Sequence, residues 1–344
     1  ALGSLPEFFH LVRNGVAFPH NRYGAYVGYK TDHDPRQRAT SAGPKTSIQM
    51  VECSLANVRR YGIPILDGVE IIRLLTTWDG GRRRIVGALG LDISRLDQPD
   101  MGVVAFVADY VVLAAGGPGE LYAASAYPPG QVGGLGLGLE VGCPAANLAE
   151  SQFGLASLGF RWNLSGSYQQ VIPCYFSTDE SGGDTRYFLN EYFPEMVTEA
   201  GAIFRKGYQW PFHAEHLSDF GSSLVDLAVW NETRSGRRVF LDFSRNPVAT
   251  GGLEPFALDA LDPEARGYLQ RSGATQATPL ERLRHMNPLA VEVFAEKGVD
   301  LSQPLAVAVC AQHCNGGLAV DLWWQTPVLG LFAIGEVAGT HGVR

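Results

Sequence analysis

The chain has 344 residues, enough for a sizeable core and two domains, and carries a net charge of -8. This acidic balance argues against a nucleic-acid-binding protein, whose contact surface should be basic. No apolar run reaches the roughly 18 residues of a membrane span, so no transmembrane segment is expected. The five cysteines are an odd number, which disfavours a disulfide framework and favours a reducing, cytoplasmic setting.

The first part of the chain combines a helix with several short strands. Apolar residues recur at helical spacing from Thr46 to Tyr61, and Thr46 with Gln49 resembles a capping box. Asp79-Gly80-Gly81 is typical of a hairpin turn between strands. The strands expected around it are Ile63–Leu66, Val69–Thr76, Ile85–Leu91 and Val103–Ala108.

Two apolar runs end in glycine and predict buried parallel strands. The first, Tyr110–Gly117, closes on two glycines, and the second is Leu329–Glu336. Open α/β sheets bind ligands at such strand ends. Between the two runs the sequence becomes richer in aromatic residues, and helices are expected at Ser222–Thr233 and Pro288–Lys297. The simplest account is one domain interrupted by an inserted domain.

Three segments carry a recognisable combination of motifs: Val112–Gly117, His313–Gly317, and Gly330–Glu336 followed by His341-Gly342. In the same order, the succinate dehydrogenase, fumarate reductase and aspartate oxidase flavoproteins carry Ala-Thr-Gly-Gly, His-Tyr-x-Met-Gly-Gly and Gly-Leu-(Phe/Tyr)-Ala-x-Gly-Glu. The chain therefore resembles that family over most of its length. The resemblance implies an α/β fold, with an incomplete FAD-binding, Rossmann-like flavin domain and an inserted α+β capping domain. The expected division is 1–150 and 305–344 for the flavin domain and 151–304 for the capping domain.

The same resemblance implies a set of cofactor-binding residues. Gly116 and Gly117 would let the backbone approach FAD, and the backbone of Val69 and Glu70 would lie near the adenine. Glu336 would accept hydrogen bonds from ribose or ribityl hydroxyls, the alternative being a surface or capping carboxylate. The full expected set is Val69, Glu70, Ala115, Gly116, Gly117, Gly133, Gly335, Glu336 and His341.

On the substrate side, the resemblance implies catalytic roles for His313 and Arg344. His313 would bind a substrate carboxylate, the alternative being a core histidine that follows the buried strand Leu305–Val309. Cys310 and Cys314 flank His313 at a spacing that suggests a metal. Zinc sites need four ligands at tighter spacings, so no metal is predicted.

The sequence also departs from the family pattern. No Gly-x-Gly-x-x-Gly loop for the pyrophosphate occurs, so we expect roughly a hundred further residues upstream and weak or no FAD binding by the chain as it stands. The family's His-Pro-Thr-Gly is absent near Gln152–Leu155, and Ser222 or Ser223 stands where a catalytic arginine is expected. Because serine cannot replace the planar fork of arginine, fumarate or succinate is a doubtful substrate.

Three functional hypotheses remain open at this point. The first is an FAD enzyme that transfers hydride between the flavin and a carbon–carbon bond of a small organic substrate, with a carboxylate as one candidate. The second is a degenerate, flavin-free binding or assembly subunit. The third is another flavoprotein on the same scaffold, such as a ketosteroid-dehydrogenase-like enzyme or a subunit with an electron-transfer partner.

Overall fold

The computed structural model describes residues 3–31 and 34–340, which form two compact units. The first unit contains residues 1–64 and 154–309, and the second contains 65–153 and 310–344. The expected domain boundaries near 150 and 304 lie close to the borders of these units. Residues 1–64 group with residues 154–309, for example through Lys30–Glu264 (2.9 Å) and Lys45–Glu296 (2.6 Å). Their expected assignment to the flavin domain stays a prediction.

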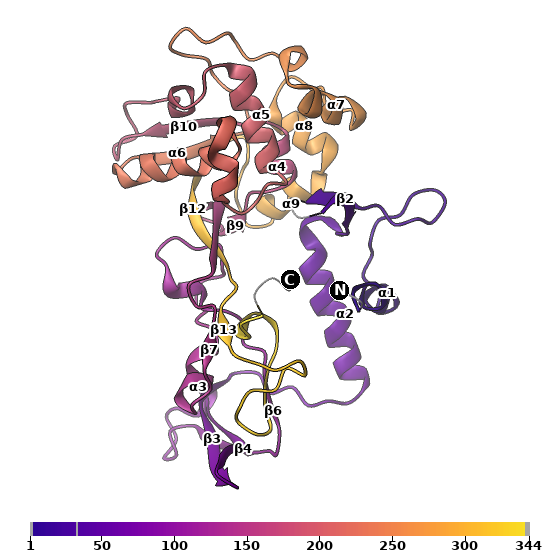
Figure 1. The fold of residues 1–344 in the computed structure, drawn as a ribbon, viewed down its shortest axis with the longest axis vertical. Helices are drawn as coiled ribbons and strands as arrows, with labels where there is room; N and C mark the ends of the chain where they lie inside the picture. The colour runs from indigo at the N-terminus through magenta and orange to yellow at the C-terminus, as the bar shows by residue number, and fades with distance from the viewer. Residues whose placement is uncertain (1–2, 32–33, 341–344) are drawn as a thin grey trace. The chain divides into compact units, whose positions relative to one another are not determined.

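The first unit is a mixed helix and strand structure around a five-stranded sheet of order β10-β11-β12-β8-β9 (Figure 1). Its helices are α1 (Ser4–Arg13), α2 (Thr46–Arg60), α4 (Ser167–Gln170), α5 (Met196–Lys206), α6 (Ser223–Arg234), α7 (Pro263–Arg271), α8 (Pro279–Met286) and α9 (Pro288–Ala295). Its strands are β1 (Tyr29–Thr31), β2 (Asp34–Ala39), β8 (Ser151–Ser157), β9 (Trp162–Asn163), β10 (Cys174–Thr178), β11 (Arg238–Asp242) and β12 (Leu305–Cys314).

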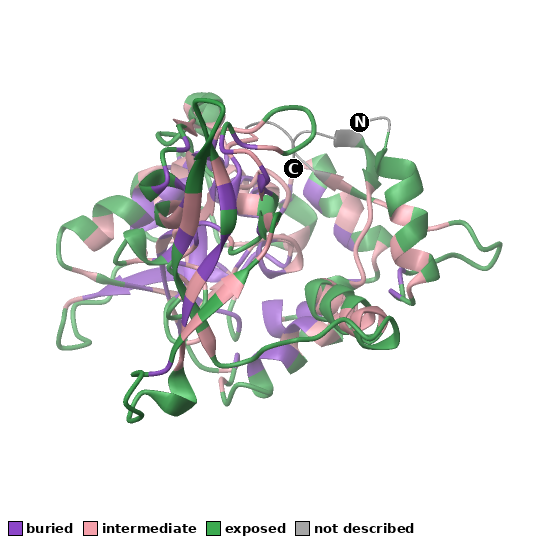
Figure 2. Cartoon of the chain, turned by 90° about the horizontal axis from the view of Figure 1, so that it is seen from below, coloured by how far each residue is buried: buried purple, intermediate pink, exposed green. Residues whose placement is uncertain are grey.

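The core of the first unit is built by residues 154–309. Helix α5 buries Ala200, Ile203 and Phe204, which recur at helical spacing and therefore share one face. All five residues of β10 are buried, although β10 is an outer strand of its sheet. By contrast, α1 and α2 contain no buried residue, and the helices near the N-terminus are green and pink in Figure 2.

A fully buried arginine fixes α8 in this core. Arg282 donates to the carbonyl oxygen of Val171 through Nε (3.1 Å) and Nη2 (2.8 Å), and to the Gln276 carbonyl through Nη1 (2.9 Å). Nη2 also donates to Asn246 Oδ1 at 2.6 Å. Burial lowers the pKa of Arg282 to about 10. The guanidinium is thus held by neutral oxygens, which satisfy its donors.

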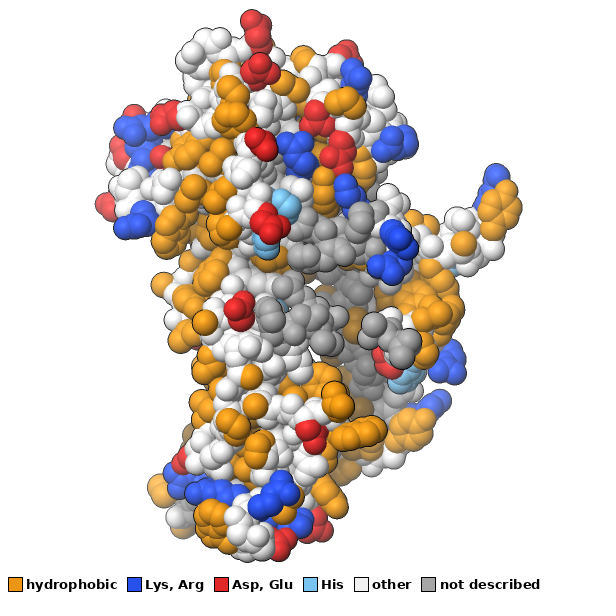
Figure 3. Space-filling model, in the orientation of Figure 1, with side chains coloured by type: hydrophobic (Ala, Val, Ile, Leu, Met, Phe, Trp, Pro, Cys, Tyr) orange, Lys and Arg blue, Asp and Glu red, His pale blue; other side chains and the backbone are white. Residues whose placement is uncertain are grey.

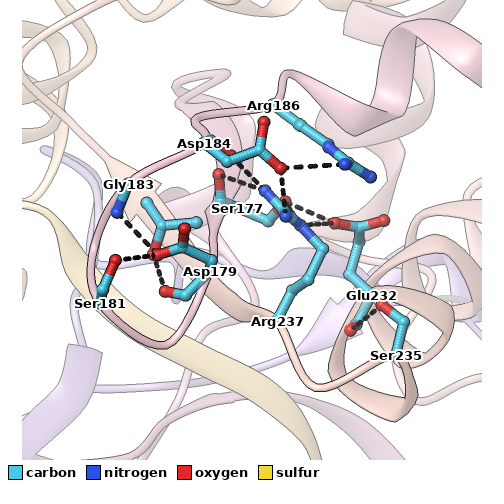
Figure 4. Close-up of polar contacts among 10 residues, drawn as sticks. Ser177, Asp179, Ser181, Gly183, Asp184, Arg186, Glu232, Ser235 and Arg237 are labelled. Atoms are coloured by element: carbon cyan, nitrogen blue, oxygen red, sulfur yellow. Dashed lines mark hydrogen bonds and ion pairs between the residues drawn. The ribbon is translucent and has the colours of Figure 1, made fainter.

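A second arginine joins the end of α6 to β10. Arg237 Nε donates to Ser177 Oγ and Glu232 Oε2, both at 3.0 Å, and Nη1 lies 2.8 Å from Asp184 Oδ2 (Figure 4). The guanidinium therefore ties together a helix, a strand and the loop that follows the strand, in a site where Arg237 is largely shielded from water.

The second unit is built mainly from short sheets. Its strands are β3 (Val69–Asp79), β4 (Arg82–Asp92), β5 (Val103–Val107), β6 (Val111–Leu113), β7 (Ala145–Ala146), β13 (Gly317–Leu318) and β14 (Leu331–Ala333), and its helix is α3 (Leu135–Glu140). The predicted hairpin is confirmed, since Asp79 pairs with Arg82 across Gly80 and Gly81. Both glycines have positive φ (55° and 81°), the conformation that a two-residue hairpin turn requires.

The two glycine-terminated runs, each expected as a buried strand, pair with each other. Strand β6 pairs in parallel with β14, with Leu331 opposite Val111 and Ala333 opposite Leu113. Leu113, Leu331 and Ala333 belong to the buried cluster of this unit. This parallel pair agrees with the α/β fold class expected from the sequence.

Two local predictions are wrong. Residues 63–66 form no strand but an irregular segment between turns at 61–62 and 67–68. Thr46 and Gln49 form no capping box: Thr46 Oγ1 donates to the Gly43 carbonyl, and Gln49 Oε1 accepts from the Ala17 amide. Gln49 therefore holds a distant loop instead of its own helix.

A candidate flavin site at the ends of two parallel strands

The segments that follow β6 and β14 lie side by side in the second unit. Gly116 and Gly335, which follow the two strands, both have positive φ (73° and 67°) and turn the chain at the strand ends. Gly117 N–H donates to Glu336 Oε2 at 3.1 Å across the two segments. Predicted site residues more than 200 positions apart in sequence are therefore brought together.

Glycine is required in this region by close backbone packing. A Cβ atom on Gly133 would lie 2.7 Å from the carbonyl oxygen of Gly117. A Cβ on Gly117 would lie 2.7 Å from the Glu336 carboxyl carbon, and one on Gly134 would meet the Ala115 side chain at 2.7 Å. A side chain at Gly133 would therefore displace the Gly117 backbone, whereas one at Gly117 or Gly134 would push against the Glu336 or Ala115 side chain.

The carboxylate of Glu336 is the centre of a hydrogen-bonded group, the Glu336 cluster, which consists of Gly117, Tyr127, His313, Cys314 and Glu336. Glu336 Oε1 lies 2.6 Å from His313 Nδ1 and accepts the Cys314 amide at 2.8 Å. It also accepts the hydroxyl of Tyr127, which in turn accepts the Cys314 amide at 3.1 Å. The cluster thus joins the end of β12 to the end of β14.

These contacts decide the protonation state of the cluster. Burial alone would raise the pKa of Glu336, but the hydrogen bonds from His313, Tyr127 and the Cys314 amide outweigh it and lower the pKa to about 2. The pKa of Tyr127 is raised above its ordinary value, first by burial and then by its hydrogen bond to Glu336. At neutral pH the cluster therefore holds an ionised carboxylate beside a neutral phenol.

The site fits the sugar part of a flavin dinucleotide. Glu336 Oε1 is saturated by three donors, whereas Oε2 accepts only the Gly117 amide from the described residues. Oε2 has two lone pairs and uses one of them for Gly117, so it retains capacity for one hydroxyl. A Cβ at Gly335 would meet nothing within 4 Å, so the backbone there is open to a ligand.

The other predicted site residues lie elsewhere. Val69 and Glu70 begin β3, where they pair with Asp92 and Leu91, and within the described part of the chain neither is hydrogen-bonded to the Glu336 cluster. His341 and Arg344 lie outside the described residues. Sequence reasoning missed Tyr127, because a single tyrosine in a loop carries no local signal of its distant partners.

The positions that depart from the family motifs are packed tightly in the first unit. Ser222 is fully buried and donates to Gln209 Oε1 at 2.7 Å, and Ser223 Oγ accepts the His213 amide at 3.0 Å. Both serines therefore have structural partners at the start of α6. Nearby, Lys206 and Asp226 form a buried ion pair at 2.5 Å.

Within residues 3–31 and 34–340, no three His, Cys, Asp or Glu side chains gather in a way that suits a metal ion. In the same residues, every helix is too short or too polar to cross a bilayer.

Comparison with known proteins identifies relatives of the chain. Residues 9–170 match the FAD binding domain family. The chain is 26% identical to the L-aspartate oxidase of Streptomyces coelicolor (97% of this chain, 49% of that protein). It is 25% identical to a component of the fumarate reductase (CoM/CoB) of Methanothermobacter marburgensis (90% of this chain, 46% of that protein). It therefore spans about half the length of these relatives.

The solved structures agree in fold. A variant of the FrdA flavoprotein of Escherichia coli quinol fumarate reductase superposes with a TM-score of 0.64 at 20% identity, over 99% of this chain and 52% of that one. Sequence and fold together show that residues 9–170 match an FAD binding domain and that the chain is similar to L-aspartate oxidase and fumarate reductase proteins.

Proposed function

We propose that the protein is an FAD-dependent oxidoreductase that transfers hydride between the flavin and a carbon–carbon bond of a small organic substrate. The observation that carries this proposal is the convergence of Gly117, Gly133 and Glu336 at the ends of β6 and β14, where the family motifs were expected. The FAD-binding relatives support the cofactor.

In this proposal each part of the cluster has a distinct task. When bound, FAD supplies the hydride chemistry at its ring system. Gly117 and Gly133 keep the backbone clear of side chains, and Oε2 of Glu336 accepts a cofactor hydroxyl. Glu336 also orients His313 through Nδ1, which leaves Nε2 of the half-buried ring for a substrate oxygen.

The proposed substrate is a small organic molecule, with a carboxylate as one candidate because the relatives are named for aspartate and fumarate. The partnered serines at the start of α6 favour a substrate that does not need an arginine at that position. We propose an electron-transfer partner as well. A reducing, cytoplasmic compartment suits the five cysteines, none of which forms a disulfide.

The test is an absorbance spectrum of the purified full-length protein, followed by FAD release and reloading. We expect oxidised flavin bands, and bleaching of these bands when small organic acids are added without oxygen. Gly133→Ala should weaken FAD binding at least about tenfold, because its Cβ would meet the Gly117 carbonyl at 2.7 Å. Gly130→Ala is the matched control, since Gly130 also has positive φ but a Cβ there would meet nothing within 4 Å.

Different outcomes separate the hypotheses. A protein that shows no flavin bands and cannot be loaded with FAD would favour the flavin-free binding subunit, which the buried serines at the start of α6 also permit. Equal loss of FAD affinity in the Gly133 and Gly130 variants would remove the assignment of the glycine loop to the cofactor.

A further inference from the structure

Strand β5 forms one outer edge of the sheet β3-β4-β5 and is unlike the other edge. Its five residues, Val-Val-Ala-Phe-Val, include no charge and no proline. The opposite edge, β3, carries Glu70, Arg73 and Asp79 and has two irregularities of register. Figure 3 shows Lys and Arg side chains gathered at the end of the molecule where Figure 1 places the β3–β4 hairpin. Charges and bulges are the usual protection of an exposed edge, and β5 has neither.

The backbone of β5 directs hydrogen-bonding groups away from its sheet. Asp92 N–H donates to the Gly102 carbonyl, and Ala108 N–H donates to the Val86 carbonyl. In an antiparallel ladder, the backbone hydrogen bonds alternate along each strand. The N–H and C=O groups of even-numbered residues of β5 therefore point to β4, and those of odd-numbered residues point away from the sheet. Ala105 and Val107 therefore present both N–H and C=O at the edge, and no strand of the described residues pairs with them.

Side chains around this edge are apolar and exposed. Val107 is 92% exposed and Val103 is 39% exposed. Met101 and Tyr110, which flank the strand, are also exposed. A row of exposed apolar side chains beside unpaired backbone groups is an interaction surface of the strand-addition type.

The sequence of β5 complements itself. When two copies lie antiparallel about Ala105, Val103 of one copy lies opposite Val107 of the other, and Val104 lies opposite Phe106. No two like charges face each other within the strand. The N–H and C=O groups of Ala105 meet those of the second Ala105, and Val107 N–H meets the Val103 carbonyl, whereas Val103 N–H already donates to the Asp100 carbonyl at 2.9 Å. A two-fold axis through Ala105 closes the assembly, so only two copies join.

We propose that β5 is a dimerisation edge, through which two copies of this chain join their three-stranded sheets by antiparallel β5–β5 pairing. The contact is short, so the association is weak and depends on concentration. The β5 edge contains none of the proposed flavin-site residues, so the dimer can be tested independently of the proposed activity.

The test introduces charged residues at the two-fold axis. Dimerisation is then measured by sedimentation or light scattering over a range of concentrations. Ala105→Lys places two like charges opposite each other and should weaken dimerisation at least about tenfold. Ala105→Glu should do the same. An equimolar mixture of the two variants should recover the dimer, because opposite charges then meet. Thr77→Lys, an exposed position on β3, is the matched control and should leave dimerisation unchanged.

The mixture distinguishes pairing from misfolding, since a variant that failed to fold would not be rescued by its partner. Recovery of the dimer only in the mixture supports the proposal. A monomer at every concentration, a dimer that survives Ala105→Lys, or equal loss with Thr77→Lys would each overturn it. Binding of the monomer to lipid vesicles or to an unrelated peptide through β5 would also overturn it, in favour of a different occupant.

Discussion

Replacement of Glu336 by glutamine tests the electrostatics of the candidate site directly. The carboxylate accepts hydrogen bonds from Tyr127, the Cys314 amide and the Gly117 amide, and pairs with His313. An amide has one oxygen that accepts and one nitrogen that donates. Glu336→Gln therefore keeps the shape of the side chain but turns one of its two ends into a donor that faces other donors.

The expected magnitude follows from the pKa of Glu336. A carboxyl whose pKa falls from 4.5 to about 2 gains roughly 3 kcal/mol of stabilisation when ionised. Because the folded-state pKa is lowered, this stability is complete above about pH 4.5 and is lost as the pH falls through about 2. Glu336→Gln should therefore destabilise the protein by about 2–3 kcal/mol at pH 7, and the difference from the unchanged protein should shrink below about pH 4.5.

The assay is urea unfolding of both proteins between pH 7 and pH 3, with Glu150→Gln as control. Glu150 is exposed and belongs to the same unit, so its replacement should change stability by less than about 0.5 kcal/mol. A stability loss from Glu336→Gln that stayed constant down to pH 3 would refute the reasoning, because the loss would then come from shape and not from charge.

Three further predictions concern the first unit, each measured by urea unfolding. Arg282→Met should cost about 3–5 kcal/mol, because the Val171 carbonyl and the other buried oxygens around the guanidinium lose their donors; a cost below about 1 kcal/mol would contradict this. Lys206→Met should cost a similar amount at pH 7 by leaving Asp226 unpaired, and less at low pH, where Asp226 becomes neutral; a cost that rises at low pH would be inconsistent. Thr278→Ala should cost about 1 kcal/mol by removing the capping box of α8, and no change would show that the cap is dispensable.

Local signals predicted the elements that depend on short-range chemistry. The hairpin at Gly80 and Gly81 forms where expected, because two adjacent residues with positive φ leave few alternatives. Helix α6 was expected at Ser222–Thr233 and spans Ser223–Arg234, because its apolar residues follow one helical face. The apolar runs that end in glycine predicted strands where β6 and β14 form, although the pairing of the two with each other was not predicted.

Long-range contacts account for what the sequence did not reveal. The hydroxyl of Tyr127 donates a hydrogen bond to Glu336, 209 positions away, and no sequence pattern near Tyr127 indicates that partner. The position of residues 1–64 beside 154–309 likewise involves contacts between residues far apart in sequence, such as Lys45–Glu296. Gln49 left its expected capping role because the Ala17 amide, 32 positions earlier, competes for its side chain.

The discontinuity of the second unit has a consequence for biosynthesis. Gly117 and Glu336 are 219 positions apart, yet one hydrogen bond joins them. At a translation rate of about 5–20 residues per second, the ribosome needs roughly 10–45 s to make the second partner after the first. During that interval β6 and its glycine loop emerge without the strand that completes them. Throughout this delay the nascent chain presents an apolar strand with no β14 to cover it, which is the kind of segment that chaperones bind.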